Sequence, residues 1–191
     1  MWLKQHLLHN LGTSPLELPE RYKDADVYSI EEEAFQKAAT KYLKDFYELA
    51  DKGIGMLLIG RSRTWKTYTA AAVARRVHMV PLDVVFVQCA VDILELARNQ
   101  FADSTKRQLE HYQKASFLVM DDFAEIPPNT PGHMMLLGIA EARFGNQRPT
   151  IWTGNVGGKR EEVMVELSQR YGPGFARRIH DGSEGFRIRA S

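Results

Sequence analysis

One stretch, residues 54–76, constrains the fold more than any other part of the chain. An apolar run from Met56 to Ile59 is followed by a short polar loop that starts at Gly60, and then by an Ala-rich segment that starts at Lys66. This is the strand–loop–helix order of a phosphate-binding loop, in which backbone N–H groups and the helix N-terminus hold phosphate oxygens. In that pattern the lysine neutralises the β- and γ-phosphates, and the hydroxyl of Thr67 binds Mg²⁺.

The loop departs from the usual pattern at one fixed position. The pattern Gly-x-x-x-x-Gly-Lys-Ser/Thr has glycine where this chain has Trp65. Trp65 either adopts the glycine-like backbone, at a cost of about 1–3 kcal/mol, or reshapes the loop so that it binds nothing. Both alternatives stay open at the level of sequence. The candidate nucleotide-binding residues are Gly60, Arg63, Thr64, Trp65, Lys66 and Thr67.

Polar side chains follow two later apolar strands. Asp121 and Asp122 end the run that starts at Phe117, and the segment from Arg148 ends in Thr153 and Asn155. One carboxylate of such a pair can hold Mg²⁺ while the next polarises the attacking water, and an amide can orient that water. Acid pairs and Asn before Val-Gly-Gly are also common in turns. After a phosphate loop in the same chain, the site interpretation is the stronger one.

The alternation of segments predicts an α/β fold. Five β-rich segments, separated by helical ones, describe a parallel sheet covered by helices on both faces. In such sheets, ligands bind outside the carboxyl ends of the strands. The three groups of candidate residues all follow carboxyl ends, so we expect them to meet at one edge. The predicted strands are 54–59, 83–87, 117–121, 149–153 and 185–189.

Length and composition set further bounds. A chain of 191 residues is expected to form one domain with a short extension, here a helical extension over 1–50 and a core over 51–191. The extension is predicted to hold an amphipathic helix over 1–11 and a second helix, capped by Ser29, that runs to about Ala50. One cysteine, Cys89, excludes a disulfide framework and a cysteine-based zinc site. With no apolar run of about 18–20 residues and no signal-peptide pattern, we expect a cytoplasmic protein without a membrane partner.

The net charge of +1 gives no global signal for nucleic acid, so any such contact needs a local patch. The helical stretch over 99–114 is polar, and with Arg98 it carries Lys106 and Arg107 among few carboxylates. Such a run is either a solvated helix face or a basic surface for single-stranded DNA.

In this order and at these intervals, the motifs resemble the AAA+ ATPases, and most closely the DnaC/DnaI helicase loaders and the related IstB transposition ATPases. The resemblance runs from about Leu16 to the C-terminus. Its motifs are the lead-in over 18–25, the altered phosphate loop, the Walker B-like strand over 118–123 and the sensor 1-like strand over 149–155.

The resemblance implies an AAA+ P-loop NTPase core with a five-stranded parallel sheet and no C-terminal lid domain. It implies ATP and Mg²⁺ as ligands, with Thr67 and Asp121 at the metal, Asp122 and Asn155 at the attacking water, and Arg178 as an arginine finger for a neighbouring subunit. It implies a DnaB-type replicative helicase, single-stranded DNA near residues 92–114 and self-association as the interactions.

Ser62, Arg63 and Trp65 depart from the family's loop, which leaves open whether ATP is hydrolysed or only bound. A non-hydrolysing AAA+ scaffold and an IstB-like transposition ATPase remain as alternatives.

Overall fold

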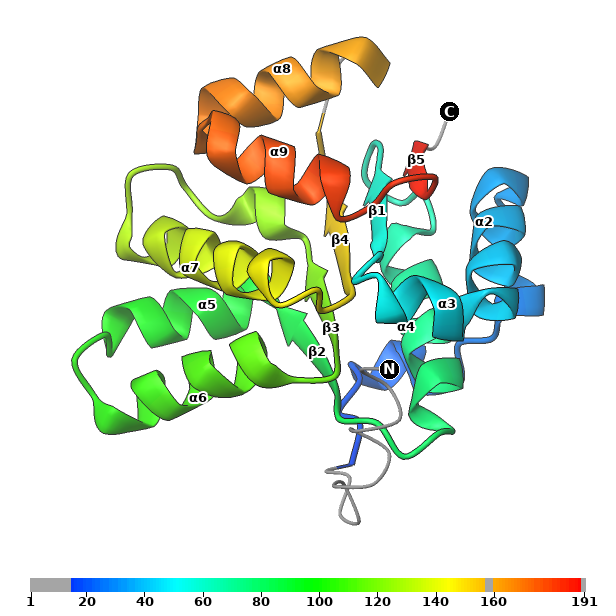
Figure 1. The fold of residues 1–191 in the computed structure, drawn as a ribbon, viewed down its shortest axis with the longest axis horizontal. Helices are drawn as coiled ribbons and strands as arrows, with labels where there is room; N and C mark the ends of the chain where they lie inside the picture. The colour runs from blue at the N-terminus through cyan, green and yellow to red at the C-terminus, as the bar shows by residue number, and fades with distance from the viewer. Residues whose placement is uncertain (1–14, 157–159, 190–191) are drawn as a thin grey trace.

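The computed structural model describes residues 15–156 and 160–189, so the helix predicted over 1–11 lies outside the described residues. The core is a five-stranded sheet in the order β2-β3-β4-β1-β5, and every pair of neighbouring strands is parallel (Figure 1). The strands are β1 (Met56–Ile59), β2 (Val84–Gln88), β3 (Phe117–Asp121), β4 (Thr150–Gly154) and β5 (Arg187–Arg189). The predicted five-stranded parallel sheet is confirmed.

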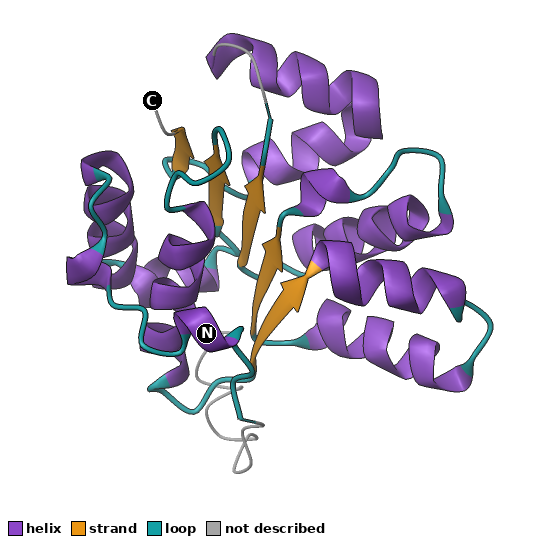
Figure 2. Cartoon of the chain, turned by 180° about the vertical axis from the view of Figure 1, so that it is seen from behind, coloured by secondary structure: helices purple, strands orange, loops and turns teal. Residues whose placement is uncertain are grey.

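Helices cover both faces of this sheet, as the sequence predicted (Figures 1 and 2). One side carries α2 (Glu33–Lys44), α3 (Phe46–Asp51) and α4 (Lys66–His78). The other side carries α5 (Cys89–Arg98), α6 (Asp103–Lys114), α7 (Pro131–Gly145), α8 (Arg160–Tyr171) and α9 (Pro173–Asp181).

The strands are apolar throughout because both of their faces are buried. Along β1, Met56 and Leu58 belong to the hydrophobic cluster under α2 and α4, whereas Leu57 and Ile59 belong to the cluster under α5, α7, α8 and α9. In α4 the whole run 70–74 is fully buried. Its mostly alanine side chains let this helix lie close to the sheet and to α2, which fixes the start of α4 beside the end of β1.

The segment before the sheet differs in detail from its prediction. The short helix η2 (Val27–Ser29) is capped by Asp26, whose side chain accepts a 2.9 Å hydrogen bond from the backbone N–H of Tyr28. Ser29 therefore ends η2 and does not cap α2, which has Glu32 as its N-cap. The predicted helix is also broken at Asp45, so that α2 and α3 are separate. Both pack into the same hydrophobic cluster as α4 and the sheet; the domain division at residue 50 stays a prediction.

The carboxyl ends of β1, β3 and β4 lie at one edge, and the candidate residues follow them. The last element of the described range is β5. No helix within residues 15–156 and 160–189 is long and apolar enough to cross a membrane.

Candidate nucleotide-binding site

The loop between β1 and α4 keeps the backbone of a phosphate loop although two of its glycines are replaced. Gly60 has φ 148°, a value that residues with a side chain rarely adopt. Arg63 and Trp65, which stand where the family's loop has glycine, have φ 63° and φ 60°. For each non-glycine residue the left-handed region costs about 1–2 kcal/mol. Of the two alternatives for Trp65, the structure therefore shows the one in which tryptophan takes the strained backbone.

An aromatic contact holds Trp65 in place. Its ring lies edge-on to Tyr68 with 4.9 Å between the ring centroids, and it packs against the cluster under α4. Edge-to-face pairs add about 0.5–1.5 kcal/mol to the burial of the rings. The contact thus offsets part of the backbone strain and fixes the start of α4.

Lys66, the first residue of α4, is buried beneath this loop. Its ammonium group donates hydrogen bonds to the carbonyl oxygen of Arg61 (2.6 Å) and to Thr64 Oγ1 (3.2 Å). Thr64 Oγ1 in turn donates to the same Arg61 carbonyl at 2.7 Å. Burial lowers the pKa of Lys66, against the opposing effect of Asp122 and Asp121. A positive charge is therefore held inside the loop, where a phosphate group would compensate its desolvation.

The two carboxylates after β3 are joined to β4 by one threonine. Thr153 Oγ1 donates a 2.6 Å hydrogen bond to Asp121 Oδ1 and accepts a 2.9 Å hydrogen bond from the backbone N–H of Asp122. Burial raises the pKa of Asp121 to about 6, although the hydrogen bonds from Thr153 and Thr67 act in the opposite direction. Burial also raises the pKa of Asp122, with Lys66 opposing it.

Lys66 and Asp122 open onto one cavity of about 560 Å³, whereas the buried Asp121 and Thr153 do not line it. Asn155 lines it, and its buried Oδ1 has no hydrogen-bond partner among the residues that the structure describes. The cavity is lined by Arg21, Tyr22, Ser62, Arg63, Thr64, Trp65, Lys66, Thr67, Tyr68, Asp122 and Asn155.

The donor set of this cavity fits a nucleoside triphosphate with Mg²⁺. Cations and a helix N-terminus lie on the loop side, and the Thr67 hydroxyl is close enough to Asp121 to lower its pKa against the larger effect of burial. No cluster of three or more His, Cys, Asp or Glu side chains exists in the described parts of the chain. Mg²⁺ rarely needs such a cluster, because one or two protein ligands, water and phosphate oxygens complete its shell.

Comparison with solved structures places this arrangement in a known fold. The DnaC helicase loader superposes with a TM-score of 0.75 over 89% of this chain and 99% of its own, at 21% sequence identity. DnaI gives 0.70 over 92% and 93%, at 19% identity. DnaA bound to AMPPCP and single-stranded DNA gives 0.69 over 90% of this chain and 50% of its own, at 12% identity.

The chain has the fold of the DnaC helicase loader and of DnaI. Neither a family model nor a curated protein sequence matches it. At these identities the likeness concerns the fold, so the activity must be argued from the site.

Within this fold, the candidate arginine finger lies away from the chain's own cavity. Arg178, on α9, donates a 3.0 Å hydrogen bond to Glu141 on α7 and does not line the nucleotide cavity. Its neighbour Arg177 pairs with Asp181 at 3.4 Å. A role of Arg178 toward a neighbouring subunit stays a prediction.

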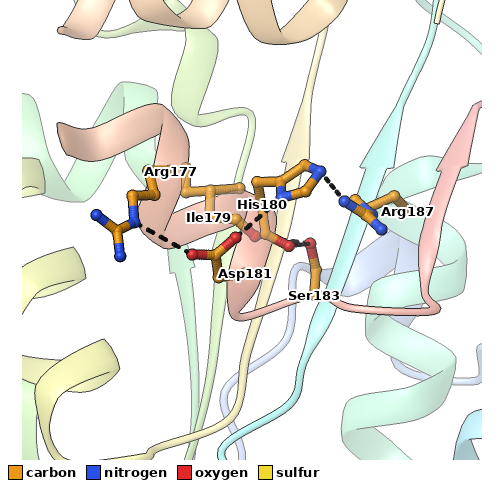
Figure 3. Close-up of polar contacts among 6 residues, drawn as sticks. All are labelled: Arg177, Ile179, His180, Asp181, Ser183 and Arg187. Atoms are coloured by element: carbon orange, nitrogen blue, oxygen red, sulfur yellow. Dashed lines mark hydrogen bonds and ion pairs between the residues drawn. The ribbon is translucent and has the colours of Figure 1, made fainter. Parts of the chain in front are cut away.

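The end of α9 is tied to the edge strand β5 (Figure 3). Asp181 accepts from His180 Nδ1 at 3.0 Å, and the guanidinium group of Arg187 on β5 donates to His180 Nε2. The Ser183 hydroxyl donates to the carbonyl oxygen of Ile179 at 2.6 Å and closes the helix. These contacts hold α9, which carries Arg177 and Arg178, in a fixed position relative to the sheet.

Three residues around the cavity have roles that the sequence did not assign. Arg21 and Tyr22 come from the lead-in segment over 18–25, to which the sequence assigned no role in the site, and Tyr68 lies just inside α4. The lead-in lies far from the loop in sequence, and periodicity gives no signal for such a contact. The only available signal was the match of residues 18–25 to the segment that precedes the family's ATPase core.

Proposed function

We propose that this chain is an ATP-binding AAA+ protein that places a hexameric replicative helicase of the DnaB type on single-stranded DNA and acts as an oligomer. The observation that carries the proposal is the single cavity in which Lys66, Thr67, Asp122 and Asn155 meet, in a fold that covers nearly all of the DnaC loader. Both the loop and the acid pair are in place despite Trp65.

In this proposal each residue has one role. Lys66 and the loop N–H groups bind the β- and γ-phosphates. Thr67 and Asp121 hold Mg²⁺, which neutralises phosphate charge. Asp122 accepts a proton from the attacking water, and the unpartnered Oδ1 of Asn155 orients that water. Arg178 of one subunit serves the site of the next, for which it must leave Glu141.

The helix pair α5–α6 offers the surface for single-stranded DNA. Lys106 pairs with Asp103 in the same helix. Arg98 and Arg107 are exposed and form no ion pair with any residue that the structure describes. Between the helices, the side chain of Phe101 is 87% exposed. Unpaired guanidinium groups beside an exposed aromatic ring suit a flexible strand, since bases stack on rings and phosphates bind cations.

The strain at Trp65 and Arg63 supports a second candidate, a non-hydrolysing scaffold. In that case the loop binds nucleotide weakly, and the fold serves only as an adaptor between helicase and DNA. The two candidates differ in whether helicase loading depends on ATP and Lys66.

A loading assay tests the proposal. The tagged chain is purified from its native host to identify the helicase that accompanies it, and the two purified proteins are combined with ATP on DNA that has a single-stranded gap. We expect unwinding to increase with the wild-type chain and not with Lys66→Ala. Equal stimulation by Lys66→Ala identifies the scaffold; a transposase as the bound partner identifies an IstB-like ATPase; no stimulation by either chain contradicts loading.

A further inference from the structure

The lead-in segment over residues 19–26, here called the strap, lines the nucleotide cavity with Arg21 and Tyr22 and is tied to α4 by polar contacts near its far end. Near its far end, the carbonyl oxygen of Ala25 accepts a 2.5 Å hydrogen bond from Arg75 Nη1. Asp26 forms an ion pair of 2.9 Å with Arg76 and donates its backbone N–H to the Tyr68 hydroxyl at 3.2 Å. All three partners lie on α4, so the strap leaves the phosphate-binding helix at a defined point.

The other end of the strap carries Arg21 and Tyr22 over the cavity. The guanidinium carbon of Arg21 lies 4.6 Å from the centroid of the Tyr22 ring. The Tyr22 ring lies edge-on to Tyr68 at 6.3 Å, and Tyr68 is the ring that holds Trp65. A continuous series of cation–π and edge-on ring contacts therefore joins Arg21 to Trp65, the strained residue of the phosphate loop.

Arg21 brings a positive charge to the acidic side of the cavity. It is exposed, and it forms no ion pair with any residue over 15–156 and 160–189. Its charge lowers the pKa of both Asp121 and Asp122 against the larger opposing effect of burial. The hydroxyl of Thr67, the proposed Mg²⁺ ligand, is close enough to Tyr22 to lower its pKa against the larger effect of burial. The unpaired cation thus lies where a terminal phosphate would meet the metal ligands.

We propose that Arg21 binds the terminal phosphate of the nucleotide from within the same chain, and that this contact fixes the strap over the cavity. The inference rests on the proposed nucleotide site and adds to it a residue that distinguishes a triphosphate from a diphosphate. ADP would leave Arg21 stacked on Tyr22, whereas ATP would add an ion pair at Arg21 to the contacts that already hold the strap.

Nucleotide affinities test this assignment. A hydrogen bond between charged groups is worth enough that its loss weakens binding about tenfold to a hundredfold. We expect Arg21→Gln to weaken ATP·Mg²⁺ by about that factor while ADP·Mg²⁺ changes little, measured by calorimetry on the full chain. The matched control is Lys23→Gln, which removes a positive charge from the same strap at a residue that pairs with Glu20 and does not line the cavity.

Backbone amide exchange provides a readout that does not depend on affinity. We expect ATP, but not ADP, to slow exchange over residues 19–24 in the wild type, and Arg21→Gln to abolish that protection. Equal weakening of both nucleotides, or an unchanged ATP affinity with intact protection, overturns the assignment to Arg21. In that event, loss of ATP binding in Lys66→Ala would still support the nucleotide site, whereas a wild-type chain that binds no ATP refutes both proposals.

Discussion

Replacement of Trp65 tests whether the phosphate loop keeps its glycine-like backbone. Alanine at this position loses the ring but keeps a Cβ at φ 60°, whereas glycine loses both. The left-handed conformation costs a residue with a Cβ about 1–2 kcal/mol, and the greater freedom of glycine in the unfolded chain returns about 0.5–1 kcal/mol of that difference. We therefore expect Trp65→Gly to be more stable than Trp65→Ala by about 0.5–1 kcal/mol.

Both variants should be less stable than the wild type. Each loses the edge-on contact with Tyr68 at 4.9 Å between ring centroids, which is worth about 0.5–1.5 kcal/mol. Each also loses the burial of the indole ring against the cluster under α4. The expected order of stability is therefore wild type, Trp65→Gly, Trp65→Ala.

Urea unfolding of the three proteins measures this order. The matched control is Lys37 in α2, whose side chain is 74% exposed and whose backbone is helical. There the order must reverse, with alanine more stable than glycine by about 1 kcal/mol. If the Trp65→Ala variant is at least as stable as the Trp65→Gly variant, residue 65 does not have a positive φ and the strained-loop account is wrong.

Three further predictions concern the metal, DNA and assembly. Because burial raises the pKa of Asp121 to about 6, the metal-free protein should lose stability as pH rises through that value. Asp121→Asn should remove this loss along with Mg²⁺ binding. If the wild type and Asp121→Asn show the same dependence of stability on pH, the prediction is wrong. Alanine at Arg98 and Arg107 should reduce the slope of log binding constant against log salt concentration for an oligonucleotide by about 0.7 per lost phosphate contact. An unchanged slope would show that these residues only form a solvated helix face. Mixing Arg178→Ala with Lys66→Ala should restore ATPase activity at mixed interfaces; no recovery from assembled mixtures excludes a finger.

The strands and the edge where the site lies could be predicted from sequence because burial on both sheet faces leaves an apolar run in each strand. Asp121, Asp122 and Thr153 follow such runs, and parallel order brings their carboxyl ends together. Parallel order therefore predicts which residues meet without any knowledge of distances, and the predicted α/β fold is confirmed.

Contacts between distant segments could not be predicted in the same way. The strap reaches the cavity through single side chains, and neither Arg21 nor Tyr68 belongs to a periodic pattern. The pairing of Arg178 with Glu141 depends on how α9 lies against α7. The conformation of Trp65 was open for a different reason, since strain and aromatic packing oppose each other with similar magnitude.

The central claim is that this altered loop binds ATP through Lys66, and calorimetric titration with ATP·Mg²⁺ tests it most directly. The informative set is the wild type, Lys66→Ala and Asp122→Asn, because Asp122 has φ 51° and asparagine tolerates that conformation well. We expect the wild type and Asp122→Asn to bind ATP with similar affinity, with turnover lost only in the latter, and Lys66→Ala not to bind. Wild-type affinity in Lys66→Ala, or no binding by the wild type, would contradict the claim.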